Sequence, residues 1–532
     1  MTDKKTTYSL GIVLLAMVLG MVLGVMFAPK LDRSYWHQQT DNMMNQRVNR
    51  LMHIVDNYYV DNINYDSASE SMMNSMLASL DPHSRYLSPD ELKKEVELVR
   101  GNFEGVGVVL FYVGDTVYAG EVMSGSPAER AGVLPGDRIM RVDTTLVSGA
   151  GLCKKPEGVV GIIRGPRFST VTLGVQRGGS KQIVPIKIQR NVINRSSIPT
   201  VTMLDKTTGY IFISHFADNT GNEFSKAVAT LKKQGMQHLV IDLRSNGGGV
   251  LQSAIEVADE LLPKGDLIVY TQGAHEKRQN VYATRGGGFE SGKLTILINE
   301  FSASASEVVS GAIQDNDRGT IVGRRSFGKG LVQREFDLPG DAAMLLTIAR
   351  YYSPSGRCIQ RPYDKGSDEY YTQYLMRLLN SDDADTLFDA DTAQCFLTKK
   401  GRKVYGGGGI QPDKVIPFIH DKDLMYYNRV LDANVPHEAA MDYLHLHYGE
   451  IIKKYPTAEN FEKNFQVSDA EWNRLLALAD KKGLKRDETC IKKYGNEIKA
   501  RYKAFLAQSL YGTSSYYRIM LPFDDELQKA LK

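Results

Sequence analysis

The stretch SASASEVVSGAIQD, residues 302–315, places Ser302, Ser304 and Ser306 at the start of a predicted helix. A serine in this position can cap the helix, because its hydroxyl accepts a hydrogen bond from a free backbone N–H. It can also attack a carbonyl, since the free N–H groups and positive end of a helix stabilise a developing oxyanion. Taken alone, the stretch favours capping over nucleophilic attack.

A nucleophilic serine needs a base, and the usual choice is histidine. His215 and His238 lie in predicted strands, where packing explains them. The alternative is Lys329, which lies between two glycines in the apolar stretch SFGKGLVQ. To act near neutral pH, its pKa must fall to about 7 to 8 from an ordinary value of about 10.4. Burial can lower the pKa that far, and Arg324 and Arg325 would lower it further if they lie close. Taken alone, a lysine in a turn is more often a surface feature.

The sequence lacks the motifs that are typical of other catalytic chemistries. The chain contains no HExxH metal motif, no GxSxG elbow and no complete phosphate-binding loop. A net charge of +3 over 532 residues, without a basic stripe, argues against nucleic-acid binding. We therefore expect no metal, no organic cofactor and no nucleic-acid partner.

The elements around the serines predict a layered α/β core. HLVIDLR is a buried strand that leads into the loop SNGGG and a helix, and LTILINE is a strand that ends at the serine stretch. Later strands begin at TIVGRRSFGKGLVQ and AAMLLTIARYY. Strands alternating with helices form a mostly parallel sheet, whose sites lie at the carboxyl ends of the strands.

Residues 101–190 have a different character, since short β-prone runs alternate with glycine turns. The segment GSPAERAGVLPGDRIMRVD contains a short helix with a serine cap, a turn and a strand. This pattern resembles a PDZ domain of the kind found in bacterial proteases. The resemblance implies that an extended C-terminal tail adds a strand to a sheet edge, with its carboxylate held by the loop of Gly105, Val106, Gly107 and Val108. The alternative is a small β-module that serves only as a spacer.

The N-terminus predicts a membrane segment. Lys4 and Lys5 precede an uncharged run at residues 10–28, which as a helix spans about 28 Å. A cleaved secretory signal and an uncleaved anchor both fit this run. The poor cleavage pattern around Phe27-Ala28-Pro29 favours the anchor, and the lysines place that end in the cytoplasm. We therefore expect a single-pass inner-membrane protein with its catalytic domain in the periplasm or another extracytoplasmic space.

Four cysteines, at positions 153, 358, 395 and 490, match no zinc motif. Cys395 and Cys490 could pair, but free thiols are the slightly favoured alternative.

Three motifs follow one another along the chain: VIDLRSNGGG, NEFSASASEVVSGAIQD and VGRRSFGKGLVQ. Together with the preceding PDZ-like module, they resemble the core of the carboxyl-terminal processing peptidases, also called tail-specific proteases. YYSPSGRCIQ and GIQPDKVI match the closing strands of that family, so the resemblance covers residues 35–418 apart from a polar insertion. It implies an α/β multidomain fold: a crotonase-like layered α/β peptidase core, an inserted β-rich PDZ domain, a helical N-terminal region and a helical C-terminal appendage. The predicted boundaries are 1–30 for the signal anchor, 31–100 for the helical N-terminal region, 101–190 for the PDZ domain, 191–362 for the core, 363–405 for the insertion, 406–419 for the closing strand and 420–532 for the C-terminal helices.

The resemblance also assigns roles to residues. It implies Ser304 as the nucleophile, Lys329 as the general base and Gln333 as the group that orients the lysine. The oxyanion hole would use the N–H groups of Ala305 and of one glycine in the loop, for which we choose Gly248. Gly247 stands where the family often has proline, which loosens that last assignment.

The implied function is a serine endopeptidase that captures protein substrates by exposed apolar C-terminal tails. A second hypothesis is a catalytically silent scaffold that only binds C-termini, although such relatives tend to lose the serine and lysine that this chain keeps. A third is a crotonase-like acyl-transfer enzyme, against which the PDZ-like module and the lack of a nucleotide signature argue. We expect residues 31–100 to serve packing or dimerisation. The C-terminal helices could dock an adaptor, shape a homo-oligomer or cover the site.

Overall fold

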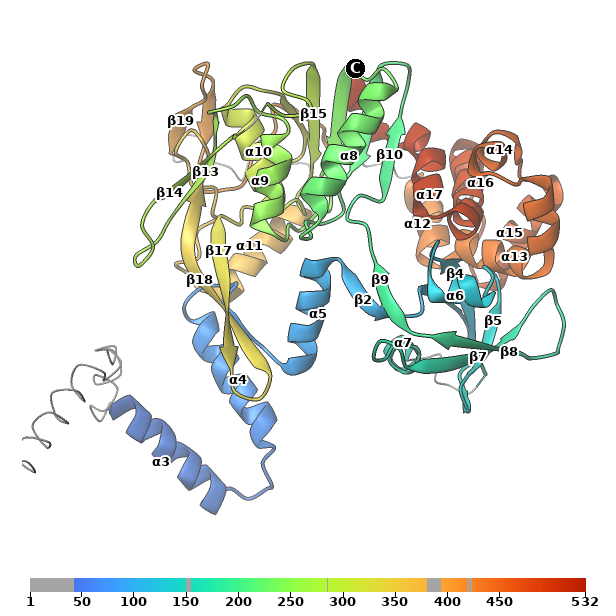
Figure 1. Cartoon of the computed structure of the whole chain (residues 1–532), viewed down its shortest axis with the longest axis horizontal. Coiled ribbons are helices and arrows are strands. Elements are labelled where there is room, and N and C mark those ends of the chain that lie inside the picture. Colours follow the sequence, from blue (N-terminus) through green and yellow to red (C-terminus); the bar gives the residue numbers. More distant parts are fainter. Residues whose placement is uncertain (1–42, 150–154, 285, 380–393, 419–420, 422) are drawn as a thin grey trace, which may run out of the picture. The chain divides into compact units, whose positions relative to one another are not determined.

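The computed structural model describes residues 43–149, 155–284, 286–379, 394–418, 421 and 423–532 (Figure 1). The chain divides into two compact units, residues 1–72 and 73–532. The first unit holds α3 (Met43–Tyr58) and the start of α4 (Tyr65–Ala78). Every described strand lies in the second unit.

A six-stranded sheet forms the centre of the second unit, in the order β10-β11-β12-β15-β16-β21. Its strands are β10 (Thr200–Met203), β11 (Thr208–Phe212), β12 (His238–Asp242), β15 (Lys293–Ile298), β16 (Thr320–Gly323) and β21 (Lys414–Val415). All neighbours pair in parallel except β10, which is antiparallel to β11. The connecting helices are α8 (Thr220–Lys233), α9 (Leu251–Asp259) and α10 (Ala305–Asp315). Their apolar sides share one buried core with the strands, which is the parallel α/β layering that the sequence predicted.

A second sheet is built from strands of distant segments of the chain. It consists of β1 (Arg85–Leu87), β13 (Leu267–Gln272), β14 (Gln279–Tyr282), β17 (Leu331–Leu338) and β18 (Ala342–Tyr352). The stretch TIVGRRSFGKGLVQREFDL is therefore divided between two sheets, with β16 in the first and β17 in the second. The loop that joins them carries Lys329.

Residues 102–194 form a separate β-module with its own hydrophobic core. Its sheet has the order β3-β4-β5-β7-β8, and β6 pairs with β5. The elements are β3 (Val108–Val113), β4 (Thr116–Val122), α6 (Pro127–Ala131), β5 (Arg138–Val142), β6 (Thr145–Leu146), α7 (Pro156–Ile163), β7 (Thr170–Gln176) and β8 (Val184–Gln189). A two-stranded ribbon of β2 (Asn102–Gly105) and β9 (Asn191–Asn194) flanks the module in sequence. Within the described sheet, β3 pairs only with β4, so its other edge has no partner strand.

The segment that the sequence predicts as a polar insertion contains regular structure. The helix α11 (Ser367–Leu379) and a hairpin of β19 (Cys395–Leu397) and β20 (Lys403–Tyr405) lie within it. The described part of the insertion is therefore folded against the core rather than a plain loop.

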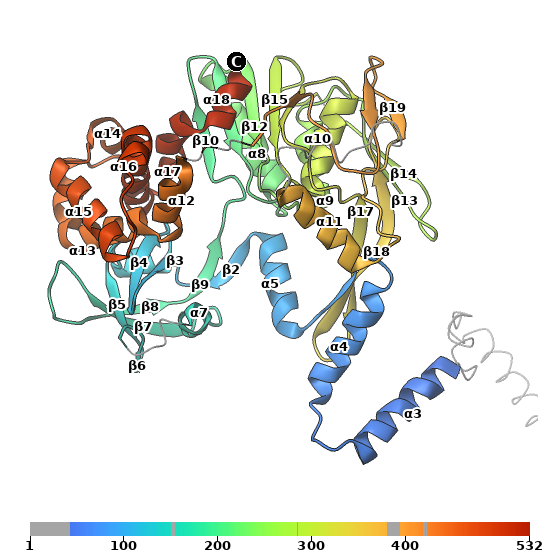
Figure 2. The same cartoon turned by 180° about the vertical axis from the view of Figure 1, so that it is seen from behind.

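The C-terminal helices pack on both the β-module and the core. They are α12 (Leu424–Asp432), α13 (Val435–Lys454), α14 (Ala458–Asn464), α15 (Asp469–Lys481), α16 (Glu488–Tyr511), α17 (Thr513–Met520), the 3-10 turn η3 (Leu521–Phe523) and α18 (Asp525–Leu531). Figure 2 shows α12 to α16 gathered beside β3, β4 and β5, and the Tyr118 hydroxyl of β4 donates to Asp442 of α13 at 2.8 Å. At the other end, Leu521 and Leu527 are buried against Tyr210 and Val240 of the core sheet. The appendage predicted from the sequence therefore bridges two parts of the second unit.

The prediction of a membrane protein needs correction. The predicted span at residues 10–28 lies outside the described residues. Among the helices that the structure describes, none has both the length and the apolar character needed to cross a bilayer. The longest of them, α16 (24 residues), interrupts its apolar positions with lysine, arginine and glutamate. The predicted single-pass inner-membrane localisation, with a periplasmic catalytic domain, is therefore not supported by the helices that the structure describes.

The cysteines follow the slightly favoured alternative. Cys358, Cys395 and Cys490 are free thiols, and Cys395 is exposed whereas Cys490 is buried. Cys153 lies outside the described residues.

Candidate active site

Of the three serines at the start of the opening motif, only Ser304 is partly accessible. Ser302 and Ser306 are buried, and their hydroxyls donate to the backbone carbonyls of Leu243 and Asn246 at 2.8 and 2.9 Å. Ser304 is only partly buried, and its backbone has φ 55° and ψ −113°. A non-glycine residue adopts such a conformation at a cost, and such strain is typical of functional positions. Ser304 therefore stands at the N-cap of α10, where it forms a capping box with Glu307.

Glu307 gathers the segments on either side of this serine. It is buried, and its Oε2 accepts the backbone N–H of Ser304 at 2.8 Å and that of Lys329 at 2.9 Å. Its Oε1 accepts the N–H of Gly328 at 2.7 Å and the hydroxyl of Ser326. Burial raises the pKa of Glu307 above its usual range, although these four donors oppose that rise.

The Lys329 amine is held by the predicted glutamine. Its Nζ donates to Gln333 Oε1 at 2.8 Å. The Gln333 amide in turn donates from Nε2 to the backbone carbonyl of His83 at 2.6 Å. That second bond fixes which end of the amide faces the lysine, since a carbonyl can only accept.

Burial lowers the pKa of Lys329, and the positive charge of Arg85 lowers it further. Glu95, which forms an ion pair with Arg85 at 2.9 Å, acts in the opposite direction. Arg324 does not take the part expected for it, because its Nε is paired with Glu300 at 2.8 Å. The charge that supports a neutral lysine therefore comes from the N-terminal part of the second unit.

Residues 81–85 were missed by the sequence reasoning, which gave this region a packing role. Asp81 Oδ1 accepts the N–H groups of His83 and Ser84, both at 2.8 Å. β1 then pairs with β18, with Arg85 opposite Leu345. The turn signal at Asp81-Pro82 was visible in the sequence, but nothing there indicated that the turn would face Gln333.

The glycine loop after β12 lies against the serine. A Cβ added to Gly248 would come within 2.8 Å of Ser304 Cβ and 3.0 Å of the Ala305 nitrogen. Gly248 has φ +102°, and its N–H donates to Asn246 Oδ1 at 2.9 Å. Ala305 is the first residue of α10, where a backbone N–H has no acceptor within its own helix. The predicted oxyanion residues thus lie at the serine, with the N–H of Gly248 already engaged.

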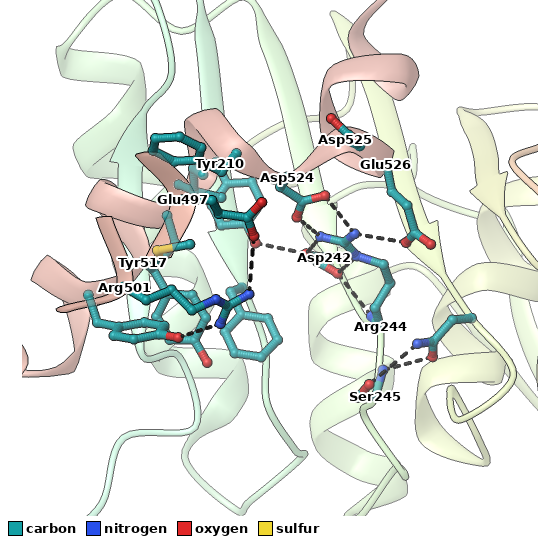
Figure 3. Close-up of a pocket in the computed structure, with 16 residues that line it drawn as sticks. Tyr210, Asp242, Arg244, Ser245, Glu497, Arg501, Tyr517, Asp524, Asp525 and Glu526 are labelled. Carbon is teal, nitrogen blue, oxygen red and sulfur yellow. Dashed lines mark hydrogen bonds and ion pairs between the residues drawn. The ribbon is translucent and has the colours of Figure 1, made fainter. Parts of the chain in front are cut away.

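Behind this loop, the C-terminal segment contacts the end of β12. A cavity of about 580 Å³ lies between the ends of the core strands and the C-terminal helices. Figure 3 shows Arg244 at its centre, where its guanidinium is paired with Asp242 at 2.6 Å and with Asp524 at 2.5 Å. Burial lowers the pKa of Arg244, but these carboxylates outweigh that effect and place it above its usual range. Arg244 directly precedes the glycine loop in the chain, so the position of Arg244 helps to set the position of the loop.

The predicted tail-binding residues belong to the β-module and not to the serine site. Val106 is buried in the core of that module. Gly107 has φ +83°, and a Cβ added there would lie 2.3 Å from Ser126 Cβ, so only glycine fits. Val108 begins the edge strand β3. The loop therefore lies at the start of a free sheet edge.

Comparisons with known proteins match three stretches of the chain. Residues 207–365 match peptidase family S41, residues 118–177 match the PDZ domain family, and residues 426–512 match a family of unknown function. The carboxy-terminal-processing protease of Bartonella bacilliformis is 36% identical over 296 residues, which are 55% of this chain and 67% of that protein. The carboxyl-terminal-processing protease of Picosynechococcus sp. is 37% identical over 300 residues, which are 54% of this chain and 69% of that protein.

Among solved structures, the photosystem II D1 C-terminal processing protease matches with 29% identity and a TM-score of 0.34. The match covers 58% of this chain and 83% of that one. The predicted α/β multidomain fold with a PDZ domain is confirmed by the family matches together with the sheet topology described above.

Proposed function

Since the chain belongs to peptidase family S41, the carboxyl-terminal-processing serine proteases, we propose that it cleaves protein substrates with Ser304 as nucleophile and Lys329 as general base. The observation that carries the proposal is the shared carboxylate of Glu307, which holds the backbones of both residues. The pKa of the partly buried Lys329 is lowered, and the partly accessible Ser304 shares the Glu307 acceptor with the Lys329 backbone. These features are what a serine–lysine pair requires.

The reaction begins with the neutral amine of Lys329. Its lone pair accepts the Ser304 proton as Oγ attacks the peptide carbonyl, and a tetrahedral oxyanion forms. Collapse of this intermediate breaks the C–N bond, the lysine returns the proton to the leaving amine, and an acyl-enzyme remains. Water then attacks the ester, with the lysine again accepting a proton, and Ser304 is released.

Gln333 gives the amine its direction. A neutral lysine has two N–H groups and one lone pair, and one N–H is committed to Gln333 Oε1. This leaves fewer orientations for the lone pair, and the bond from Gln333 to the His83 carbonyl keeps the amide from turning its NH₂ toward the lysine.

For the oxyanion, we assign the Ala305 N–H as the first donor and Gly248 as the second. Gly248 can donate only after its N–H leaves Asn246 Oδ1. The loop at residues 246–249 would therefore shift slightly when substrate binds, and the resting site would be incomplete until then.

We assign recognition of the substrate's C-terminus to the PDZ domain. An extended tail would add as a strand to the free edge of β3, and its terminal carboxylate would meet the N–H groups of Val106, Gly107 and Val108. The β3 edge and the close fit of Gly107 against Ser126 support this role. Substrates would then be proteins with exposed apolar C-terminal tails.

The test compares the full chain with Ser304→Ala and Lys329→Ala on an unstructured polypeptide with an apolar C-terminus. The same polypeptide with an amidated C-terminus serves as the matched substrate control. We expect cleavage by the wild type alone, with a higher KM for the amidated substrate. Binding without cleavage by the wild type would favour a silent scaffold, and cleavage by either variant at the wild-type rate would refute the site assignment.

A further inference from the structure

The two loops that carry the proposed catalytic groups are each preceded by an arginine. Arg244 stands before the glycine loop that contains Gly248, and Arg324 stands in the loop that leads to Lys329. The strands before them, β12 and β16, are not neighbours in the sheet, because β15 lies between them. Backbone pairing therefore does not connect the two arginines directly.

One carboxylate of the C-terminal segment contacts both arginines. Glu526 Oε2 accepts from Arg244 Nη1 at 3.0 Å, and Glu526 Oε1 accepts from Arg324 Nη1 (Figure 3 shows the Arg244 side of this bridge). The side chains are largely shielded from solvent, with exposures of 22% for Glu526, 16% for Arg244 and 13% for Arg324. Charge-assisted bonds between shielded groups are stronger and more directional than exposed ion pairs.

Each arginine has a further carboxylate that fixes its orientation. Asp524 pairs with Arg244, and Glu300 pairs with Arg324. Burial lowers the pKa of Arg324, but Glu300 and Glu526 outweigh that effect and raise it above its usual range. Both guanidiniums therefore remain charged across the pH range in which a peptidase works.

Glu526 itself is held rigidly. It lies in the first turn of α18, and Asp524 caps that helix by accepting the N–H of Leu527 at 2.9 Å. Leu527 is fully buried against the core sheet. The carboxylate is thus anchored through the backbone of α18 to the same sheet whose loops it joins.

We propose that Glu526 is a positioning residue for catalysis, which couples the glycine loop to the lysine loop by bridging Arg244 and Arg324. The proposal rests on the proposed function. It gives the C-terminal segment a role in the reaction, although that segment lies outside the stretch that matches the peptidase family, residues 207–365. Glu526 touches no reacting atom, because it acts only through the two arginines.

The kinetic test compares Glu526→Gln with Asp525→Asn in the full chain. Asp525 is the exposed neighbour on the same helix turn, so it controls for the loss of one negative charge at this surface. A glutamine can accept from only one arginine, because its NH₂ group repels the other. We expect Glu526→Gln to lower kcat by about 10- to 100-fold, with KM within about twofold of wild type, as small misplacements of catalytic groups do. Asp525→Asn should match wild type, and equal kcat values for the two variants would overturn the proposal.

Hydrogen exchange separates coupling from a general loss of stability. The bridge predicts that Arg244→Gln speeds exchange in the lysine loop, residues 324–330, and that Arg324→Gln speeds exchange in the glycine loop, residues 245–249. In the Glu526→Gln background these cross-effects should vanish. If each arginine variant affects only its own loop, the coupling is absent.

The exchange measurement does not depend on activity. A wild-type chain that cleaves nothing would refute the proposed function while the cross-effects still test the bridge. An active wild type without cross-effects would refute the bridge alone.

Discussion

Ser304 and Lys329 are joined through a single oxygen, because Glu307 Oε2 accepts the backbone N–H of both residues at 2.8 and 2.9 Å. The proposed nucleophile and the proposed base come from different loops, one after β15 and the other after β16. A shared acceptor sets the separation of the two backbones without using either functional side chain. It also leaves the serine hydroxyl and the lysine amine available for chemistry.

Replacing this acceptor should therefore affect fold and activity together. In Glu307→Gln the new NH₂ group would face N–H donors and leave at least one of them without an acceptor in a buried site. We expect a loss of about 2 to 4 kcal/mol in the free energy of unfolding, measured by urea denaturation. The value of kcat should fall by about 100-fold or more, since nucleophile and base would no longer be aligned. Glu335→Gln, on the exposed side of β17, is the control and should resemble wild type. An active and stable Glu307→Gln variant would show that the shared acceptor is dispensable.

Gln333→Glu tests how the lysine is kept neutral. A carboxylate at this position would face Lys329 Nζ, favour its charged form and raise its pKa. In the proposed mechanism the neutral amine is the active form, so kcat/KM at pH 7.5 should fall and the rising limb of the pH profile should move to higher pH. Gln333→Ala removes the hydrogen bond that orients the lysine but adds no charge. Its activity should therefore fall without a shift of the rising limb to higher pH. The pH dependence of kcat/KM for both variants decides the matter, and identical profiles would contradict this account of Gln333.

Substitutions of Arg85 and Glu95 should shift the pH profile of kcat/KM in opposite directions. The charge of Arg85 lowers the pKa of Lys329 and that of Glu95 raises it. Arg85→Gln should therefore move the rising limb of the pH profile to higher pH, and Glu95→Gln should move it to lower pH. Both effects should shrink at high ionic strength, because the two side chains are 47% and 32% exposed. Displacements in the same direction for both variants would exclude this electrostatic origin. His83 does not explain the limb, because burial lowers its pKa to about 3.

The parts of this site that the sequence predicts are local ones. The family resemblance assigns Ser304, Lys329 and Gln333 to one site from three short motifs. The structure joins the backbones of Ser304 and Lys329 through Glu307, and it joins the Lys329 amine to Gln333. His83 and Arg85 reach the lysine only because β1 pairs with β18, a contact between distant segments. The periodicity of one strand does not reveal the register of its pairing with a distant strand, so the sequence did not indicate that Arg85 lies near Lys329.

The same reasoning explains the C-terminal helices. Their apolar periodicity predicts helices with one buried face, but it does not say what that face contacts. Leu521 and Leu527 contact the core sheet, whereas Tyr118 of the β-module joins the cluster of the other helices. The carboxylate of Glu526 gains its two arginine partners only through this packing.

The glycine loop provides the last prediction, because two adjacent glycines in it differ in their surroundings. A Cβ on Gly248 would lie 2.8 Å from both Ser304 Cβ and the Ala303 carbonyl oxygen, at φ +102°. A Cβ on Gly247 would meet no atom within 4 Å.

Gly248→Ala should therefore push the loop away from the serine and lower kcat by about 100-fold or more, the loss typical of one oxyanion donor. Gly247→Ala keeps its backbone N–H and should remain within about threefold of wild type, since small surface changes without a clash have little effect. Both variants should bind a tail peptide with the wild-type Kd, because the PDZ domain is separate, and kcat with fluorescence anisotropy of the labelled peptide would measure the two effects. If Gly248→Ala keeps wild-type activity, the assignment of Gly248 to the oxyanion hole is refuted.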